Sequence, residues 1–273
     1  MKLGMMSGAD TIKVAVENGA QGIPLAINAL AQKGPQQAIA PIAAAGLEVC
    51  QISGFAFNAL SSDKAKQAEQ RTLVEKAIPM APDTGCPVIV VNGGNYDSSG
   101  FLCGHRDNFT DKALDEAARG IEPVCRLAEK HGVKIAIEPF IQCVINTPER
   151  YLKLKEKVAS PALTVTLDVC NFFTFEDMWR PTEAVTRICS ALAGHYALVH
   201  CKDLAVAKGV HIHVDETPLG TGVADWAAAL KFIARDLPAD GWFIYEHIKA
   251  PEHAPAGMRY LREAAAKAGV AFP

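Results

Sequence analysis

Four short apolar segments of the sequence each end in a residue that can bind a hard metal ion. The residues at these ends are Glu138, Asp168, His200 and Glu246. One such residue is more often a helix cap, an ion-pair partner or a buried polar group, but four in succession are a rarer coincidence. Three carboxylates and one imidazole favour Mn²⁺, with Mg²⁺ or Co²⁺ as alternatives, over structural Zn²⁺. The pattern therefore predicts one divalent metal ion held by these four side chains.

The alternation of side chains along each segment supports this grouping. Successive side chains of a strand point to opposite faces, so the large residue before each metal-binding residue lies on the other face. On the metal-binding side the preceding residues of two segments are small, namely Ala136, Thr164 and Thr166. Small residues near the mouth and large residues toward the helices are typical of the inside of a barrel.

The elements that must position these residues recur regularly along the chain. Eight predicted strands alternate with longer helical segments, at 2–6, 22–27, 46–53, 87–92, 133–138, 163–168, 196–201 and 242–247. Strands separated by helices pair in parallel, and eight such units predict the α/β class, as a single (β/α)₈ TIM barrel with a parallel eight-stranded core over residues 1–273. The carboxyl ends of barrel strands meet at one rim, where the four residues would converge.

Capping residues mark the starts of several predicted helices. A side-chain oxygen at the cap accepts a backbone N–H of the first turn. Such residues precede five of the helical segments: Asp10, Ser61 or Ser62, Thr110, Thr147 and Asp225. A last helix is predicted from about 255 to 269.

Composition and charge narrow the class of partner. The 273 residues carry a net charge of −3 at pH 7, which gives no positive field to attract nucleic acid or a membrane surface. A small neutral or weakly charged substrate fits better, and assembly into a homo-oligomer stays open. The eight cysteines include no C-x-x-C pair, so a reduced, cytoplasmic protein is expected. We find no signal peptide or membrane span in the sequence.

Several motifs in strand order resemble a known family. They are Ile137-Glu138-Pro139, Leu167-Asp168-Val169-Cys170-Asn171, Val199-His200-Cys201-Lys202-Asp203, Pro218-Leu219-Gly220-Thr221-Gly222 with Asp225-Trp226, and Tyr245-Glu246. With them the chain resembles the xylose-isomerase-like barrel superfamily, in the sugar phosphate isomerase/epimerase branch that includes ketose 3-epimerases, hydroxypyruvate isomerase and inosose dehydratase. The resemblance spans nearly the whole chain.

The resemblance implies a metal-dependent sugar isomerase or epimerase. Glu138 and Glu246 would be the catalytic acid/base pair, which moves a proton beside a carbonyl of a keto-sugar or keto-polyol through a metal-bound enediolate. Asp168 and His200 would mainly hold the ion. The DNA-repair endonucleases of the superfamily use additional histidines at strand ends where this chain has Ile27, Ser53 and Asn92, so DNA cleavage is not expected.

Two departures from the ketose 3-epimerases keep a second reaction open. Asn171 stands where they have a substrate-binding histidine, and Val206 where they have an arginine. Lys202 in the His-x-Lys-Asp motif is more similar to inosose dehydratase, in which a lysine near the site assists elimination. A lyase is therefore the alternative, with Lys202 as a catalytic residue. A purely structural pairing of Lys202 with Asp203, or with the neighbours of Asp168 on the rim, is equally compatible with the sequence.

A few further residues are candidates for binding substrate. His105 and Arg106 lie in the turn-rich segment 93–108, which is a candidate lid, although a surface loop with an Arg106–Asp107 contact is the simpler interpretation. His211 and His213 share a face and are candidates for substrate or a second ion, but an exposed two-stranded turn is favoured. A third hypothesis, an inactive barrel that only binds sugar or serves as a subunit of a larger complex, gives no reason for two opposed glutamates.

Overall fold

The eight predicted barrel strands are all present in the computed structural model, which describes residues 1–8, 10–97 and 103–272. They are β1 (Lys2–Ser7), β2 (Gly22–Ala26), β3 (Glu48–Ser53), β4 (Val88–Asn92), β5 (Lys134–Glu138), β6 (Leu163–Leu167), β7 (Tyr196–Cys201) and β10 (Trp242–Ile248). They form a closed parallel barrel in the order β1-β10-β7-β6-β5-β4-β3-β2. The predicted fold class is therefore confirmed.

The α-helices follow the predicted alternation. They are α1 (Thr11–Glu17), α2 (Ile27–Lys33), α3 (Pro35–Ala44), α4 (Lys64–Ala77), α5 (Asp111–Lys130), α6 (Pro148–Val158), α7 (Pro181–Ala191), α8 (Trp226–Asp236) and α9 (Ala254–Ala268). Three predicted caps are confirmed, because the side chains of Thr110, Thr147 and Asp225 each accept a first-turn N–H.

Two predicted caps were wrong. The cap of α4 is Asp63 and neither Ser61 nor Ser62, because Asp63 Oδ1 accepts the N–H of Lys66 at 3.0 Å. Asp10 precedes α1 as expected but makes no capping bond, since its backbone has φ 54°. An N-cap normally has extended backbone angles, and the left-handed region directs the side chain elsewhere.

Contacts between residues divide the chain into two compact units. The first comprises Met1–Ile23, Ala45–Leu47 and Leu167–Pro273. Within it β10 pairs in parallel with both β1 and β7, and α8 packs beside α9. Trp226 of α8 meets Phe243 of β10 edge to face, with ring centroids 5.6 Å apart. This packing fixes β10, the strand that contains Glu246.

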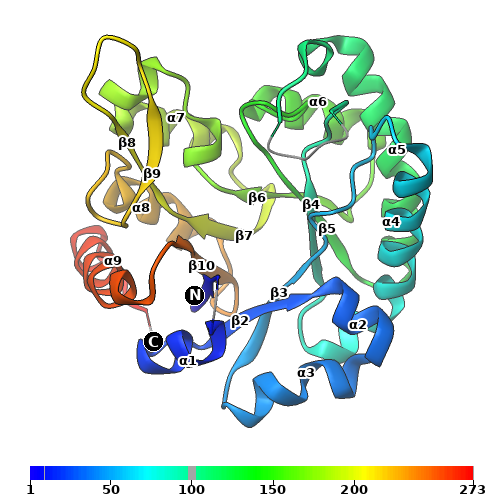
Figure 1. Cartoon of the computed structure of the whole chain (residues 1–273), viewed down its shortest axis with the longest axis horizontal. Helices are drawn as coiled ribbons and strands as arrows, with labels where there is room; N and C mark the ends of the chain where they lie inside the picture. The colour runs from blue at the N-terminus through cyan, green and yellow to red at the C-terminus, as the bar shows by residue number, and fades with distance from the viewer. Residues whose placement is uncertain (9, 98–102, 273) are drawn as a thin grey trace. The chain divides into compact units, whose positions relative to one another are not determined.

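The second unit comprises Pro24–Ala44 and Glu48–Thr166. Its strand β4 pairs with β3 and β5, and Ile89, Val90 and Val91 of β4 are fully buried. Branched residues of this kind pack well on a pleated surface covered on both faces. Helices α4 and α5 lie side by side on this unit (Figure 1).

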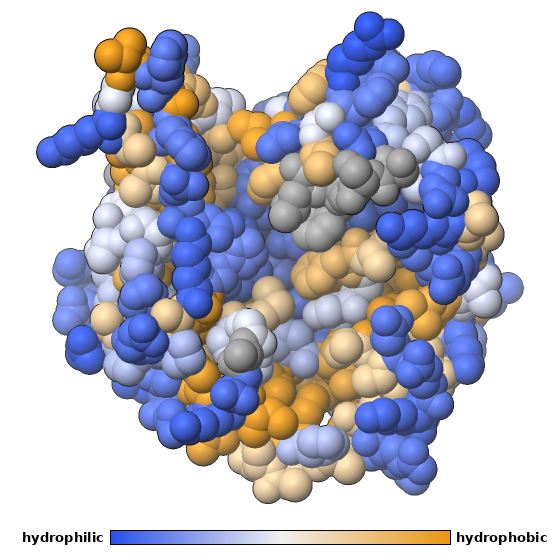
Figure 2. Space-filling view, viewed as in Figure 1, coloured by the Kyte–Doolittle hydropathy of each residue, from blue (hydrophilic) through white to orange (hydrophobic). Residues whose placement is uncertain are grey.

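A two-stranded hairpin follows β7 in the first unit. Its strands β8 (Asp203–Val206) and β9 (Val214–Thr217) pair antiparallel, as the predicted two-stranded turn requires, and the hairpin extends away from β7 (Figure 1). Figure 2 shows apolar surface at its tip, where Val210 is 96% and Ile212 57% exposed. The hairpin is thus anchored at its base and exposed at its end.

The eight cysteines are free thiols in the structure. None of the eight, all of which the structure describes, forms a disulfide, and seven are buried. Burial raises the pKa of Cys170 and Cys201 well above the usual value for a thiol. Among the described helices, none combines the length and the apolar character needed to cross a membrane.

Candidate metal centre

Three of the four predicted ligands, Asp168, His200 and Glu246, belong to the first unit. Asp168 follows β6 directly, His200 lies in β7 and Glu246 lies in β10. In the β7–β10 pairing, Ile244 is opposite His200 and Tyr245 opposite Cys201. Glu246 therefore comes level with Lys202, one residue beyond the last pair. The side chains that come together here are each at most 5% exposed: Asp168, His200, Lys202 and Glu246.

Lys202 points into this cluster and bridges two of its carboxylates. Its Nζ donates to Asp168 Oδ2 at 2.5 Å and to Glu246 Oε1 at 2.7 Å. The sequence left open whether Lys202 lies inside the site or pairs with Asp203. The structure places its ammonium between Asp168 and Glu246.

His200 approaches the same glutamate from β7. Its Nδ1 lies 2.9 Å from Glu246 Oε2, although the contact lacks hydrogen-bond geometry, and this oxygen has no hydrogen-bond partner among the described residues. Burial raises the pKa of Glu246, but Lys202 and then His200 lower it, and the resulting pKa is well below the ordinary value for a glutamate. Glu246 is thus a buried, charged carboxylate with one oxygen that no hydrogen bond satisfies.

The predicted ligands form a group that fits a metal ion. Each of Glu138, Asp168, His200 and Glu246 offers one ligand atom, and these atoms lie within 4.8 Å of one another. Three carboxylates and an imidazole suit an oxygen-preferring divalent cation. The unsatisfied oxygen of Glu246 agrees with such an ion, because a buried carboxylate oxygen without a partner costs free energy.

A bulge in β10 lies beside Glu246. Met5 pairs with Tyr245 and Ser7 with Ile248, so β10 has one residue more than β1 over this stretch. The additional length falls at Glu246 and His247, and His247 has φ 55°. Bulges often redirect a side chain next to an active site. Here the side chain of His247 contacts both Glu216 of β9 and Glu246, which links the hairpin to the site.

Asp203 explains why the glycine motif follows the His-x-Lys-Asp motif. Its buried carboxylate accepts four backbone N–H groups at 2.9–3.0 Å, from Leu204, Gly220, Gly222 and Ala224. A Cβ on Gly222 would lie 2.2 Å from Asp203 Oδ1, so no side chain fits there. Burial raises the pKa of Asp203, and the backbone N–H groups oppose that rise. Asp203 thereby fixes the backbone next to Lys202.

Asp203→Asn is expected to destabilise the fold by roughly 3 kcal/mol, because the amide nitrogen would face backbone N–H groups that need an acceptor. Urea unfolding measures this as a lower midpoint. Asp215→Asn, which changes an exposed carboxylate on the same hairpin, is the control and should leave the midpoint unchanged. Equal midpoints for the two variants would show that the four N–H groups do not depend on the carboxylate.

The other substrate-binding candidates of the first unit differ in burial. Asn171 is 4% exposed, and its backbone N–H donates to Asp168 Oδ1 at 3.3 Å, so it lies beside a proposed ligand. His211 is exposed near the tip of the hairpin, and His213 Nε2 lies 3.4 Å from Asp215 Oδ1. Contact of Asn171 and His211 with substrate stays a prediction.

His105 and Arg106 lie in the second unit, beside 3₁₀ helix η3 (Arg106–Phe109). His105 Nδ1 accepts the N–H of Asp107. Arg106 is 91% exposed, with its Nε 3.7 Å from Asp107 Oδ1, so the local contact expected for a surface loop is present. Their role in binding substrate stays a prediction. The candidate lid 93–108 includes residues 98–102, which lie outside the described residues.

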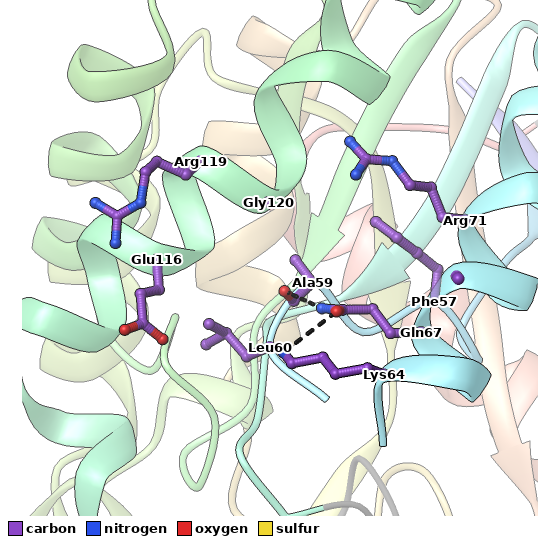
Figure 3. A pocket seen from close by; sticks show the side chains of 10 residues that line it. Phe57, Ala59, Leu60, Lys64, Gln67, Arg71, Glu116, Arg119 and Gly120 are labelled. Carbon is purple, nitrogen blue, oxygen red and sulfur yellow. Dashed lines mark hydrogen bonds between the residues drawn. The ribbon is translucent and has the colours of Figure 1, made fainter. Parts of the chain in front are cut away.

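A pocket of about 370 Å³ lies between α4 and α5 of the second unit. Figure 3 shows Lys64 and Arg71 on α4 and Arg119 on α5 around it. Lys64 Nζ donates to Ser61 O and Gln67 Oε1, and Gln67 Nε2 donates to Ala59 O. These bonds hold the segment after β3 against α4. Lys64 and Gln67 therefore have a structural role in this pocket.

Comparison with known proteins places the chain in one superfamily. A family model described as xylose isomerase-like TIM barrel matches residues 7–264. No protein with a curated description is similar enough in sequence to count as a relative.

Solved structures share the fold at low sequence identity. A xylose isomerase-like TIM barrel protein from Mycobacterium smegmatis in complex with magnesium has a TM-score of 0.73 at 16% identity, over 96% of this chain and 88% of that one. The 3-keto-D-glucoside 4-epimerase of E. coli has 0.71 at 17%, over 96% and 99%. The probable 3-DHS dehydratase of Bacillus anthracis has 0.68 at 18%, over 96% and 98%. At these identities the likeness establishes the fold.

Proposed function

The chain belongs to the xylose isomerase-like TIM barrel family, and from that premise we propose that it is a divalent-metal-dependent isomerase or epimerase of a keto-sugar or keto-polyol. The E. coli epimerase among its structural neighbours supports the substrate class. An epimerase must remove a proton beside a carbonyl and return it, and this requires a base that becomes an acid within one turnover.

The observation that carries the proposal is the buried acidic cluster. Asp168, His200 and Glu246 are at most 1% exposed, and with Glu138 they form the group that fits an ion. Buried carboxylates are costly, and the single ammonium of Lys202 compensates only part of the negative charge of this cluster. A site that retains several of them therefore has a chemical reason to do so.

In this proposal the ion is held by Glu138, Asp168, His200 and Glu246. The preferred ion is Mn²⁺, and Mg²⁺ and Co²⁺ are the alternatives. When bound, the ion supplies Lewis acidity that polarises a carbonyl and its neighbouring hydroxyl. Asp168 and His200 act mainly as ligands. Asn171, beside Asp168, is proposed to bind a substrate hydroxyl, because its side chain can both donate and accept hydrogen bonds.

Glu138 and Glu246 are the proposed acid/base pair. Glu246 takes the proton from the carbon next to the carbonyl, and Glu138 returns it from the other side, or the reverse. Burial of Glu246 excludes water, so the proton is kept within the site. Epimerisation results when the proton returns to the opposite side, and isomerisation when it returns to the neighbouring carbon.

Elimination is the second candidate function, and Lys202 is the observation that favours it. Its ammonium donates to the proposed base Glu246. An acid that can protonate a leaving hydroxyl therefore lies beside the group that removes the first proton. The dehydratase of Bacillus anthracis shares the fold. In this reaction the first proton removal is the same, and the leaving group then departs as water or alcohol.

A deuterium experiment separates the two reactions. The purified protein with Mn²⁺ is incubated in D₂O with ketohexoses, inososes and 3-keto-glycosides. Solvent deuterium on the carbon beside the carbonyl of recovered substrate and of a new epimer or isomer is the expected result. An unsaturated ketone that absorbs in the ultraviolet would instead support elimination. If no substrate of the panel exchanges or reacts, the proposed function is contradicted for these classes.

A further inference from the structure

Lys202 occupies the side of the site where two proposed ligands meet. Its ammonium donates to one oxygen of Asp168 and one of Glu246, and both are atoms from residues that would hold the ion. We infer that Lys202 is an internal cation that competes with the divalent metal ion for Asp168 and Glu246. This inference rests on the proposed function and concerns how the site takes up its ion.

The charge of the cluster explains why an internal cation is useful. Asp168 and Glu246 are 0% and 1% exposed, and Lys202 is 5% exposed. Two carboxylates that accept from the same ammonium lie close enough to repel each other, and burial strengthens that repulsion. The ammonium compensates for one of the two charges, so the metal-free protein does not bury both carboxylates uncompensated.

The surroundings fix the backbone of Lys202 and leave its side chain as the movable part. Its carbonyl oxygen accepts hydrogen bonds from Trp226 Nε1 at 2.9 Å and from Cys170 Sγ at 3.3 Å. The next residue, Asp203, is held by four backbone N–H groups. Any withdrawal of the ammonium from the carboxylates must therefore come from rotation of the four-carbon side chain, which has several staggered conformations.

Competition follows from the positions of these atoms. An ion that takes Asp168 Oδ2 or Glu246 Oε1 as a ligand must replace the ammonium at that oxygen, whereas Glu246 Oε2 lies 2.9 Å from His200 Nδ1, which belongs to another proposed ligand. The lysine thereby lowers the affinity for the metal and keeps the empty site folded. A cation that binds the metal-free state more than the loaded state has this effect by linkage.

The inference is tested by measuring metal affinity, not activity. Lys202→Met removes the charge and keeps most of the length of the unbranched side chain. Calorimetric titration with Mn²⁺ should give a Kd at least about tenfold lower than that of the wild type. The melting temperature of the metal-free variant should fall, because Asp168 and Glu246 then lack their cation. Lys208→Met removes an exposed lysine from the hairpin that follows Lys202 and should change neither value.

Two further variants keep the result clear. Should Lys202→Met fail to fold, Lys202→Gln can still donate to a carboxylate without a charge and should also tighten Mn²⁺ binding. Lys202→Arg retains the charge and should not tighten it. Equal or weaker binding by uncharged folded variants, with normal binding by the wild type, would overturn the competition and leave the metal proposal intact. Absence of Mn²⁺ binding in every protein would overturn both.

Discussion

Glu246→Gln is expected to lower kcat/KM by about 10³-fold or more on whichever keto-sugar exchanges deuterium, because an amide cannot take up the proton that the carboxylate accepts. The substitution keeps the size of the side chain and an oxygen that can accept from Lys202. The exchange of solvent deuterium into substrate should fall by the same factor, since both readings depend on the same proton removal. Metal content, measured on the same sample, shows whether the ion is retained.

A surface glutamate provides the control for this experiment. Glu252 lies in the 3₁₀ helix Pro251–His253, a few residues beyond β10, and is exposed, so Glu252→Gln should leave exchange and turnover unchanged. Glu138→Gln is the companion variant and should lose turnover to a similar degree. Full activity of either the Glu138 or the Glu246 variant with the metal still bound would show that its carboxylate is not part of the acid/base pair.

The barrel was predictable because its signals are local and repeated. Each strand is a short apolar segment, and the alternation that places Ile137 and Glu138 on opposite faces is a property of the strand itself. The rim follows from parallel pairing alone. The four proposed metal ligands could therefore be grouped from their positions at strand ends, and their ligand atoms lie within 4.8 Å of one another.

The role of Lys202 was less predictable, because it depends on register. Parity shows that its side chain shares a face with His200, but only the pairing of Tyr245 with Cys201 sets it level with Glu246. The sequence therefore left Asp203 as an equally good partner for Lys202. In the structure Asp203 is instead saturated by backbone N–H groups of the glycine motif, which needs the folded loop 218–224.

His247 was missed for a related reason. Its contacts with Glu216 and Glu246 depend on a one-residue bulge in β10, and no glycine marks the left-handed backbone at this position. Its adjacency to Glu246 was the only signal in the sequence. The same limit applies to Asp63, which competes with Ser61 and Ser62 as a cap and wins through the geometry of one turn.

Removal of the metal is expected to abolish activity and to lower the melting temperature. Dialysis against EDTA should reduce turnover to background, and Mn²⁺ should restore it more fully than Mg²⁺ or Co²⁺. An ion present at about 100 times its Kd stabilises the folded state by about 2.7 kcal/mol, which for a chain of this size is a rise in melting temperature of about 5 to 10 °C. Differential scanning calorimetry with and without Mn²⁺ measures this shift directly.

The ligand assignment is checked by Asp168→Ala in the same assay. Asp168 is fully buried beside Lys202, so the variant should lose both the restoration by Mn²⁺ and the thermal shift, whereas Asp240→Ala, at an exposed position, should keep both. Retention of full activity by dialysed protein, with metal far below one ion per chain, would contradict a divalent ion. The ammonium of Lys202 would then be the cation that these carboxylates are built around, because it is the positive charge already in contact with Asp168 and Glu246.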